Sequence, residues 1–273
     1  MKIGSVSDDD DDDDFWKKRE RRETNRSDRI ELMKKKVNKM KRFYSNNIQT
    51  NFIYLENEEA QHCAKVLRCK ENEIVEVLNG KGILYQGIIS SIQKHEVQIT
   101  IQKIVKEEKE NPNKLSIAIC PTKNPSRIEW FLEKATEIGI ANVYPIISDR
   151  TEKQSIKQER LQQIIISAAK QSGQLFFPIL HPAQKLSSLY NTTSLQFDNY
   201  FIAHCENEKK HLKDVYLKNE TALLLIGPEG DFTKTEVETA VNKNYIPVSL
   251  GNSILRVETA GVAACVMVQM MND

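Results

Sequence analysis

The sequence predicts an α/β domain built on a parallel sheet, preceded by a small β-barrel domain. From residue 115 to residue 273, apolar runs typical of buried strands alternate with helical patterns, which implies a parallel sheet covered by helices on both faces. Between residues 40 and 108, short β-branched runs follow one another with turn signals between them, as in antiparallel sheets. The polar segment 109–114, which contains Asn-Pro-Asn, indicates a linker between the two domains.

The N-terminal domain, residues 40–108, is predicted to contain one helix and several strands. Ala60, Ala64 and Leu67 recur at helical spacing within residues 57–68. Three strand-like runs follow, with the sequences EIVEVLNG, GILYQGIISSI and EVQITIQ. The Asn79-Gly80 pair between the first two runs is a hairpin signal. These features together predict a small barrel.

The C-terminal domain, residues 115–273, is predicted to hold five strands: KLSIAIC, NVYPII, YFIAHC, ALLLIG and IPVSLG. Asn124-Pro125 places a proline at the first position of a helix. A second helix is expected over about residues 155–171. Thr233 and Glu236 have the spacing of a capping box, which begins a further helix. The last helix is predicted over ILRVETAGVAACVMVQMM.

The amino-acid composition argues against several classes of protein: disulfide-bonded, zinc-binding, membrane-spanning and globally basic proteins. The 273 residues carry a net charge of +1, so there is no global basic signal for nucleic acid, and any RNA binding requires a local patch. The five cysteines are scattered without a C-x-x-C pair, which argues against disulfides and zinc and favours a reduced, cytoplasmic setting. No apolar stretch approaches the roughly 18 residues of a membrane span. We therefore expect neither a metal site nor a membrane segment.

Residues 1–39 differ in composition from the rest of the chain. An aspartate run at residues 8–14 precedes a segment of mixed charge with few apolar side chains. Such a composition does not bury enough surface to offset the entropy of ordering, so a disordered extension is predicted. An artificial addition, or upstream sequence read through before a true start at Met40, remains an alternative.

Three strand ends are the candidate binding loops, because ligands in open α/β sheets bind at the carboxyl ends of strands. Their sequences are AHCENE, IGPEGDF and LGNSILR. Glycines after two of the strands let a ligand approach the main chain. No nucleotide-binding glycine motif and no G-x-S-x-G are present, and Glu229 and Asp231 would repel a phosphate. A polar or cationic small molecule fits better, although a simple tight turn is an equal alternative for this motif.

Two long motifs carry a family resemblance. IGPEGDFTKTEVE, followed about twenty residues later by VSLGNSILRVETAGVAA, closely resembles the C-terminal motifs of the RsmE-like 16S ribosomal RNA uridine-N3 methyltransferases of the SPOUT superfamily. The resemblance runs from Met40 to the C-terminus and includes MKRFY, HCAKVLRCKENEIVEVLNGKG and KNPSRIEWFLEKATEIGIANVYPIISDRT.

The resemblance implies a PUA-like β-barrel followed by a SPOUT-type α/β domain with a deep trefoil knot. It also implies a homodimer that binds S-adenosylmethionine in the three loops and methylates N3 of a uridine in 16S ribosomal RNA. The expected substrate is this RNA within an assembled small ribosomal subunit. The implied cofactor-binding residues are His204, Ile226, Gly227, Glu229, Gly230, Leu250, Gly251, Ile254, Leu255, Arg256 and Thr259.

Arg256 and Glu229 are the candidate catalytic residues. Arg256 lies near the start of a predicted helix, where the helix dipole disfavours a cation, and it is a candidate to stabilise charge developing on the uracil oxygens. For Glu229, accepting the N3 proton and shaping the loop are equal alternatives. The candidate phosphate contacts are Arg42, Arg68, Lys123 and Arg127.

The sequence departs from the family pattern at two places. Asp231 stands where a second glycine is usual. In KQSGQ, Lys170 or Gln171 stands where an acidic residue is usual, and Gln174 stands where an arginine is usual. The alternatives to the main hypothesis are a related SPOUT methyltransferase acting at another RNA position and a non-catalytic RNA-binding or ribosome assembly factor.

Overall fold

The computed structural model describes residues 40–152, 155–192, 195–206 and 209–273. The extension predicted for residues 1–39 lies outside the described residues. Residues Arg42–Asp273 form one compact unit, and the description below concerns that unit alone.

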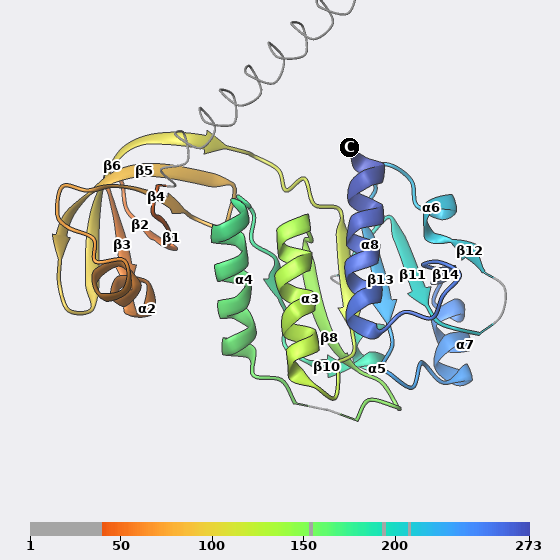
Figure 1. The fold of residues 1–273 in the computed structure, drawn as a ribbon. Coiled ribbons are helices and arrows are strands. Elements are labelled where there is room, and N and C mark those ends of the chain that lie inside the picture. The colour runs from red at the N-terminus through yellow and green to blue at the C-terminus, as the bar shows by residue number, and fades with distance from the viewer. Residues whose placement is uncertain (1–39, 153–154, 193–194, 207–208) are drawn as a thin grey trace, which may run out of the picture. The chain divides into compact units, whose positions relative to one another are not determined.

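A six-stranded sheet forms the N-terminal domain, in the spatial order β1-β4-β5-β6-β3-β2 (Figure 1). The antiparallel neighbours β4, β5 and β6 are the three predicted strands, and Gly80 adopts φ +68° in the hairpin between the first two. Strands β1 to β3 were not predicted, and β1 pairs in parallel with β4, which no local pattern reveals. The strands are Arg42–Tyr44 (β1), Asn47–Ile48 (β2), Phe52–Glu56 (β3), Ile74–Leu78 (β4), Ile83–Ile92 (β5) and Glu96–Glu107 (β6).

The helix predicted over residues 57–68 is shorter and of mixed type. An α-helical turn, α2 (Asn57–Gln61), continues into a π-helix, η1 (His62–Val66). Ala60 of α2 and Cys63 of η1 lie in the core of the domain, whereas Val66 at the end of η1 is 70% exposed. Helical spacing alone does not distinguish this arrangement from a regular α-helix.

The C-terminal domain is built on a parallel sheet in the order β10-β8-β7-β13-β11-β14-β12, with β9 beside β8. All five predicted strands are present, as β7, β8, β11, β13 and β14; the short strands were not predicted. The strands are Leu115–Ile119 (β7), Asn142–Ile147 (β8), Ile179–Leu180 (β9), Gln184–Lys185 (β10), Asn199–Ala203 (β11), Lys210–His211 (β12), Ala222–Ile226 (β13) and Ile246–Ser249 (β14).

Helices cover both faces of this sheet. The predicted proline start of α3 and the capping box of α7 are both confirmed. The last helix begins at Val257, so residues 254–256 form part of the preceding loop rather than of the helix. The helices are Pro125–Ile138 (α3), Gln158–Ser172 (α4), Leu186–Leu189 (α5), Leu212–Val215 (α6), Lys234–Asn242 (α7) and Val257–Asn272 (α8).

The alternation of side chains along β13 divides the core in two. Leu224 and Ile226 pack in one hydrophobic cluster with residues of α3, α4, α6 and α8. Leu223 and Leu225 point the other way and pack with residues of α5 and α7. Figure 1 shows α3, α4 and α8 side by side on one face of the sheet. Every residue of β13 is buried, as its apolar sequence predicts.

The N-terminal domain is joined to the C-terminal domain by backbone hydrogen bonds. The Phe177 N–H donates to the Gly80 carbonyl at 3.0 Å, and the Gly82 N–H donates to the Leu175 carbonyl at 3.0 Å. The rings of Tyr44 and Phe177 lie 4.9 Å apart. The hairpin of the N-terminal domain is thereby held against the segment that follows α4.

Within the described part of the chain, no helix has the length and apolar character needed to span a bilayer. The trefoil knot implied by the family resemblance stays a prediction.

Candidate functional site

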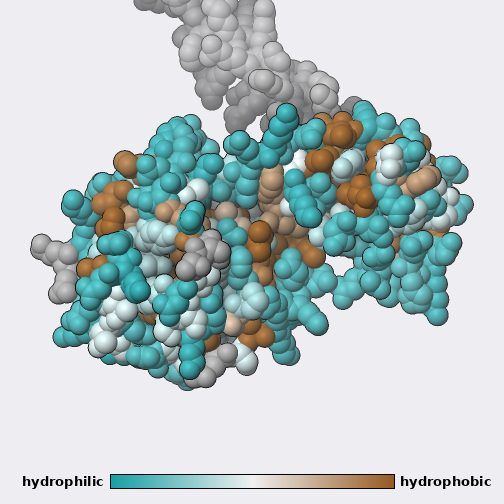
Figure 2. All heavy atoms as spheres, turned by 180° about the vertical axis from the view of Figure 1, so that it is seen from behind, coloured by the Kyte–Doolittle hydropathy of each residue, from teal (hydrophilic) through white to brown (hydrophobic). Residues whose placement is uncertain are grey.

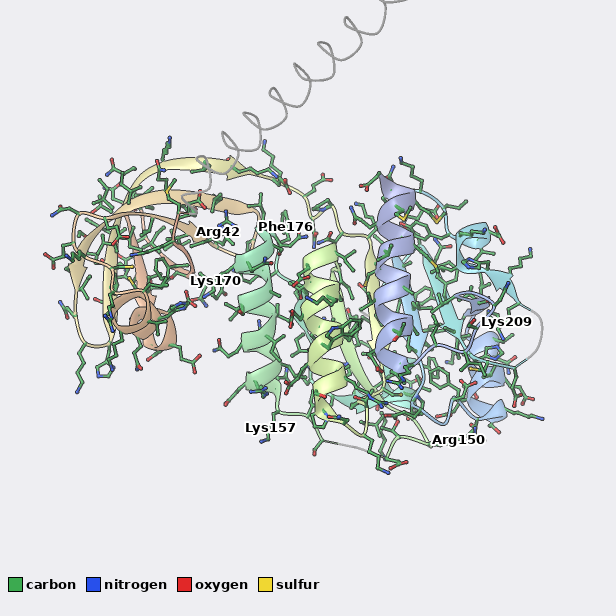
Figure 3. All side chains as sticks on the ribbon, in the orientation of Figure 1. Arg42, Arg150, Lys157, Lys170, Phe176 and Lys209 are labelled. Carbon is green, nitrogen blue, oxygen red and sulfur yellow. The ribbon has the colours of Figure 1, made fainter. Side chains whose placement is uncertain are left out.

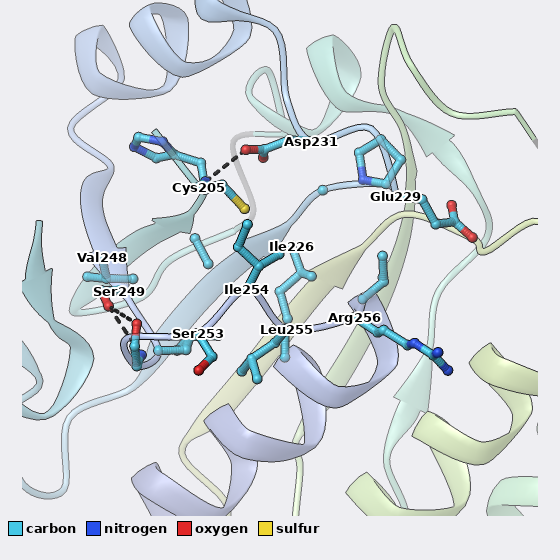
Figure 4. A pocket seen from close by; sticks show the side chains of 18 of the residues that line it. Cys205, Ile226, Glu229, Asp231, Val248, Ser249, Ser253, Ile254, Leu255 and Arg256 are labelled. Atoms are coloured by element: carbon cyan, nitrogen blue, oxygen red, sulfur yellow. Dashed lines mark hydrogen bonds between the residues drawn. The ribbon is translucent and has the colours of Figure 1, made fainter. Parts of the chain in front are cut away.

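A cavity of about 520 Å³ lies at the carboxyl ends of β11, β13 and β14 (Figure 4). Its volume suits a cofactor-sized ligand, and its position is the one that the strand-end rule predicts. Three segments line it: residues 203–205 after β11, a loop of residues 227–232 after β13, and a loop of residues 250–256 after β14. The lining includes nine of the predicted cofactor-binding residues: His204, Ile226, Gly227, Glu229, Leu250, Gly251, Ile254, Leu255 and Arg256.

Two predicted cofactor-binding residues do not line the cavity. Gly230 lies in the 227–232 loop, and its carbonyl accepts a hydrogen bond from Arg150 Nη1 at 2.8 Å. Thr259 is exposed on the first turn of α8. The lining also includes Cys205, Asp231 and Ser253, which belong to the three predicted binding loops but were not among the predicted cofactor-binding residues.

The 227–232 loop is tied to three neighbouring loops. Glu229 Oε1 accepts the backbone N–H of Lys123, which follows β7, at 2.9 Å. Asp231 Oδ2 accepts the backbone N–H of Cys205, which follows β11, at 2.8 Å. Here the loop is the acceptor in the third contact, because Arg150, which follows β8, donates to the Gly230 carbonyl. Loops at the carboxyl edge of a parallel sheet have backbone N–H groups without strand partners, and the two carboxylates of this loop supply acceptors for them.

Gly227 is closely packed against Phe232. A Cβ atom there would lie 3.1–3.2 Å from Phe232, which is buried beneath the loop. Gly227 and Pro228 are themselves buried. This part of the loop therefore presents main chain and little side chain to the cavity.

The 250–256 loop is exposed. Ser249 Oγ donates to the Gly251 carbonyl at 2.9 Å, and Gly251 adopts φ +145°. Ile254 is 85% exposed, whereas Leu255 packs against the core beneath α8. An exposed aliphatic side chain beside a cavity offers apolar contact area to a ligand or a second chain.

Arg256 is the N-cap residue of α8 and has an exposed side chain. Its guanidinium has no hydrogen-bond or ion-pair partner among the described residues. The amino terminus of a helix carries partial positive charge, so this cation stabilises neither the helix nor a local contact. In Figure 4, Arg256 and Glu229 lie at the same end of the cavity, away from Val248 and Ser249. The Arg256 guanidinium is therefore free to bind an anionic ligand, or a ligand on which negative charge develops during a reaction.

The segment after β11 contributes His204 and Cys205. Burial lowers the pKa of the half-buried His204 imidazole, with a smaller contribution from Lys209, so its neutral form is favoured near pH 7. Burial also raises the pKa of the Cys205 thiol, and the neighbouring Asp231 carboxylate raises it further. Both groups are therefore uncharged in this part of the cavity at neutral pH.

Glu258 is a buried carboxylate beside the site. It lies on the first turn of α8 and is 7% exposed. Its Oε1 lies 3.7 Å from Arg127 Nε, and its Oε2 has no hydrogen-bond partner among the residues that the structure describes. Arg127, a predicted phosphate contact, lines the cavity and is held there by this ion pair.

The other three predicted phosphate contacts lie apart from the cavity lining. Arg68 is exposed, with φ +48°, and has no side-chain partner among the described residues. Lys123 pairs through Nζ with Glu152 at 2.8 Å. Arg42 bonds to Glu76 Oε2 at 2.8 and 3.0 Å and to the Lys170 carbonyl at 3.1 Å (Figure 3). Arg42 thus joins the N-terminal domain to the end of α4.

The positions that depart from the family pattern have structural roles. Lys170 pairs with Glu59 of the N-terminal domain. Gln174 donates to the Glu137 carbonyl near the end of α3 at 3.1 Å. Across the described ranges, no group of three or more His, Cys, Asp or Glu side chains is arranged to hold a metal ion.

The fold and the site define a class: a two-domain protein with a ligand cavity at the carboxyl edge of a parallel α/β sheet. The RNA methyltransferase domain profile matches residues 109–269, and the RNA methyltransferase PUA domain profile matches residues 55–102. The chain belongs to this RNA methyltransferase family, with an N-terminal PUA-like β domain.

Known relatives cover nearly the whole described chain. A crystal structure of a probable rRNA-methyltransferase from Porphyromonas gingivalis is 33% identical, with a TM-score of 0.77, and covers 85% of this chain and 98% of its own. Ribosomal RNA small subunit methyltransferase E from Neisseria gonorrhoeae, solved bound to S-adenosyl methionine, is 27% identical, with a TM-score of 0.76 and coverage of 85% and 98%. The enzyme of that name from Rickettsia conorii is 27% identical, with coverage of 86% and 97%.

Proposed function

We propose that this chain transfers a methyl group from S-adenosylmethionine to N3 of a uridine in small-subunit (16S) ribosomal RNA. The observation that carries the proposal is the cavity at the carboxyl ends of β11, β13 and β14, whose lining includes most residues of the two long motifs. The relative from Neisseria gonorrhoeae, solved with S-adenosyl methionine bound, supports the choice of cofactor.

The residues present fit S-adenosylmethionine. The lining of the cavity of about 520 Å³ combines apolar side chains, such as Ile226 and Leu255, with main chain at Gly227 and Gly251. Such a lining suits a ligand with an aromatic base, a polar ribose and a charged amino acid end. When bound, the cofactor supplies an electrophilic methyl carbon on a sulfonium.

The chain's own residues orient the nucleotide and stabilise charge. The N3 proton of the uridine leaves to a base or to solvent, and the negative charge left on the ring is shared with the uracil oxygens until the N3–CH3 bond forms and the S–CH3 bond breaks. We assign Arg256 to these oxygens, because its unengaged cation at the rim of the cavity requires no rearrangement to bind them. We assign Glu229 to holding the 227–232 loop, because one of its oxygens already accepts the Lys123 N–H.

We propose that the RNA meets Arg127 at the cavity and Lys123 and Arg68 further away. These three cations contribute position and salt dependence rather than sequence choice. Arg42 is the weakest of the predicted phosphate contacts, because its guanidinium is already bonded to Glu76 and to a carbonyl of α4. If the RNA affinity of the Arg68→Glu variant keeps the salt dependence of the wild-type chain, Arg68 is not a phosphate contact.

We further propose a homodimer formed through α3 and α8. Val262, Val266 and Met270 recur every four residues along α8, and Val266 and Met270 are 39% and 73% exposed. Trp130, on the adjacent α3, is 43% exposed. The opposite face of the molecule is mainly hydrophilic with small hydrophobic patches (Figure 2). Sedimentation of the chain as a monomer at micromolar concentration would contradict the dimer.

We also propose that the protein is located in the cytoplasm, where ribosomal subunits are found.

Mapping of modified uridines in 16S ribosomal RNA, with and without the protein, tests the function directly. We expect one N3-methyluridine that appears only when the protein and S-adenosylmethionine are both present. A methyl group at another position would instead favour a related SPOUT activity.

A further inference from the structure

Asp231 occupies a backbone conformation that suits glycine better. Its φ is +60°, in the left-handed region where a side chain costs free energy. The family resemblance also expects glycine here. An aspartate at such a position needs a compensating interaction, and both oxygens of its carboxylate have one. Oδ1 accepts the N–H of Phe232 and Oδ2 accepts the N–H of Cys205, each at 2.8 Å.

The two hydrogen bonds have different consequences. The bond to Phe232 is local and stabilises the turn of the 227–232 loop. The bond to Cys205 spans 26 residues and connects this loop to the segment after β11. The cavity is lined by His204, Cys205 and Asp231. The bond therefore fixes the distance between two of the three segments that line the cavity.

We propose that Asp231 is a positioning residue for cofactor binding, which holds the segment of His204 and Cys205 in its binding geometry before the cofactor arrives. This inference rests on the proposed function, because it requires S-adenosylmethionine to occupy the cavity. A segment that is already held in its binding geometry does not have to be ordered when the cofactor binds, so the entropic cost of association is lower. A glycine at this position keeps the backbone conformation but supplies neither hydrogen bond.

The Asp231→Gly variant tests the proposal, because glycine tolerates φ +60° and only the carboxylate is lost. We expect the calorimetric Kd for S-adenosylmethionine to rise about tenfold, the effect of losing one hydrogen bond to a charged group. The KM for the cofactor should rise in parallel, while the rate at saturating cofactor changes less than about twofold. Asp231→Asn keeps one acceptor oxygen and should give an intermediate Kd.

Asn72→Gly is the matched control. Asn72 also has a positive φ, +68°, and is exposed in the N-terminal domain away from the cavity. This substitution makes the same change in backbone freedom, so we expect no change in the Kd. An equal rise in Kd for both variants would show that the effect is a general loss of stability and would overturn the proposal.

Cys205 provides a readout independent of activity. It is exposed, whereas Cys63, Cys69, Cys120 and Cys265 are buried. Loss of the Asp231 carboxylate lowers the pKa of the Cys205 thiol, so more thiolate is present at a given pH and reaction with iodoacetamide should accelerate several-fold. The Cys205 amide proton should also shift upfield in NMR spectra of Asp231→Gly, and Asn72→Gly should change neither signal.

The outcomes separate this inference from the proposed function. If the wild-type chain does not bind S-adenosylmethionine, both fail. If the wild-type chain binds it and Asp231→Gly binds it equally well, only the positioning role of Asp231 is overturned.

Discussion

The loops that follow β13 and β14 line the same cavity, yet the protein holds them in different ways. In the 227–232 loop, Glu229 and Asp231 accept backbone N–H groups from two other loops, and Arg150 donates to the Gly230 carbonyl. Beside the 250–256 loop, the hydrogen bonds of the Ser249 hydroxyl are local, to the Gly251 backbone, and Ile254 is 85% exposed. One loop is fixed by long-range polar contacts, and the other presents unengaged groups.

The difference assigns the two loops different tasks. A loop whose polar groups are already bonded offers a ligand a fixed shape. A loop with an unengaged cation and exposed apolar side chains offers interactions that only a ligand or a second chain completes. We therefore expect substitutions in the 227–232 loop to change mainly cofactor affinity, and those in the 250–256 loop to change chemistry as well.

The largest expected effect belongs to Arg256. Arg256→Ala should lower methylation of 16S ribosomal RNA at saturating cofactor by about 100-fold or more, the cost of removing a charge-stabilising group from an active site. Thermal unfolding should be unchanged, because the guanidinium has no partner among the described residues, and alanine preserves the backbone of the N-cap residue. Methylation rates and melting temperatures of the purified variant measure both.

Arg150→Ala is the control for this prediction. Arg150 is also a cation beside the cavity, but its Nη1 donates to the Gly230 carbonyl of the fixed loop. We expect this variant to weaken cofactor binding by a few-fold and to leave the rate at saturating cofactor nearly intact. Near-normal methylation by Arg256→Ala would remove Arg256 from the chemical step.

The two exposed glycines give a smaller, paired test. Gly251 has φ +145°, which side chains rarely adopt, and a Cβ atom there would meet no other atom within 4 Å. Any effect of Gly251→Ala is therefore backbone strain, on the order of 1–3 kcal/mol. If the loop relieves this strain by changing shape, the Kd for S-adenosylmethionine should rise about tenfold in calorimetry.

Gly230→Ala is its counterpart in the fixed loop. Gly230 does not have a positive φ, and a Cβ atom would lie 3.6 Å from Arg150 Cδ, an ordinary contact. We expect its Kd to stay within about twofold of the wild-type value. A larger effect for Gly230→Ala than for Gly251→Ala would reverse the assignment of which loop depends on its glycine.

The positions of the loops were predictable from the sequence, because strand ends are marked by local patterns. The buried run before Gly227 and the capping box of Thr233 and Glu236 predicted a loop between a strand and a helix, and the structure confirms both elements. The start of α8 was predicted about three residues early, because Ile254 and Leu255 are apolar and continue the helical pattern although they lie in the loop.

The contacts that fix the loops were not predictable. The Glu229–Lys123 bond joins residues 106 apart, and the Asp231–Cys205 bond joins residues 26 apart, so both depend on strand order rather than on any local motif. Arg42 illustrates the same limit. Its sequence neighbours suggest an exposed charge, whereas the fold places Glu76 and the Lys170 carbonyl beside it. The distant backbone N–H groups of Lys123 and Cys205 explain why the turn after the buried strand β13 carries two carboxylates.

The smallest expected effect separates the two roles of Glu229. If Glu229 holds the loop, Glu229→Gln should keep methylation within about threefold of wild type, because the glutamine carbonyl still accepts the Lys123 N–H. Glu229→Ala removes the acceptor and should raise the Kd for S-adenosylmethionine about fivefold with little change in the rate at saturating cofactor. A carboxylate that accepts the N3 proton behaves differently, since an amide does not take up a proton near neutral pH. In that case Glu229→Gln would lower the saturated rate by more than tenfold and change its dependence on pH. Rates of both variants between pH 6 and pH 9 therefore decide whether this residue of the fixed loop takes part in the chemistry.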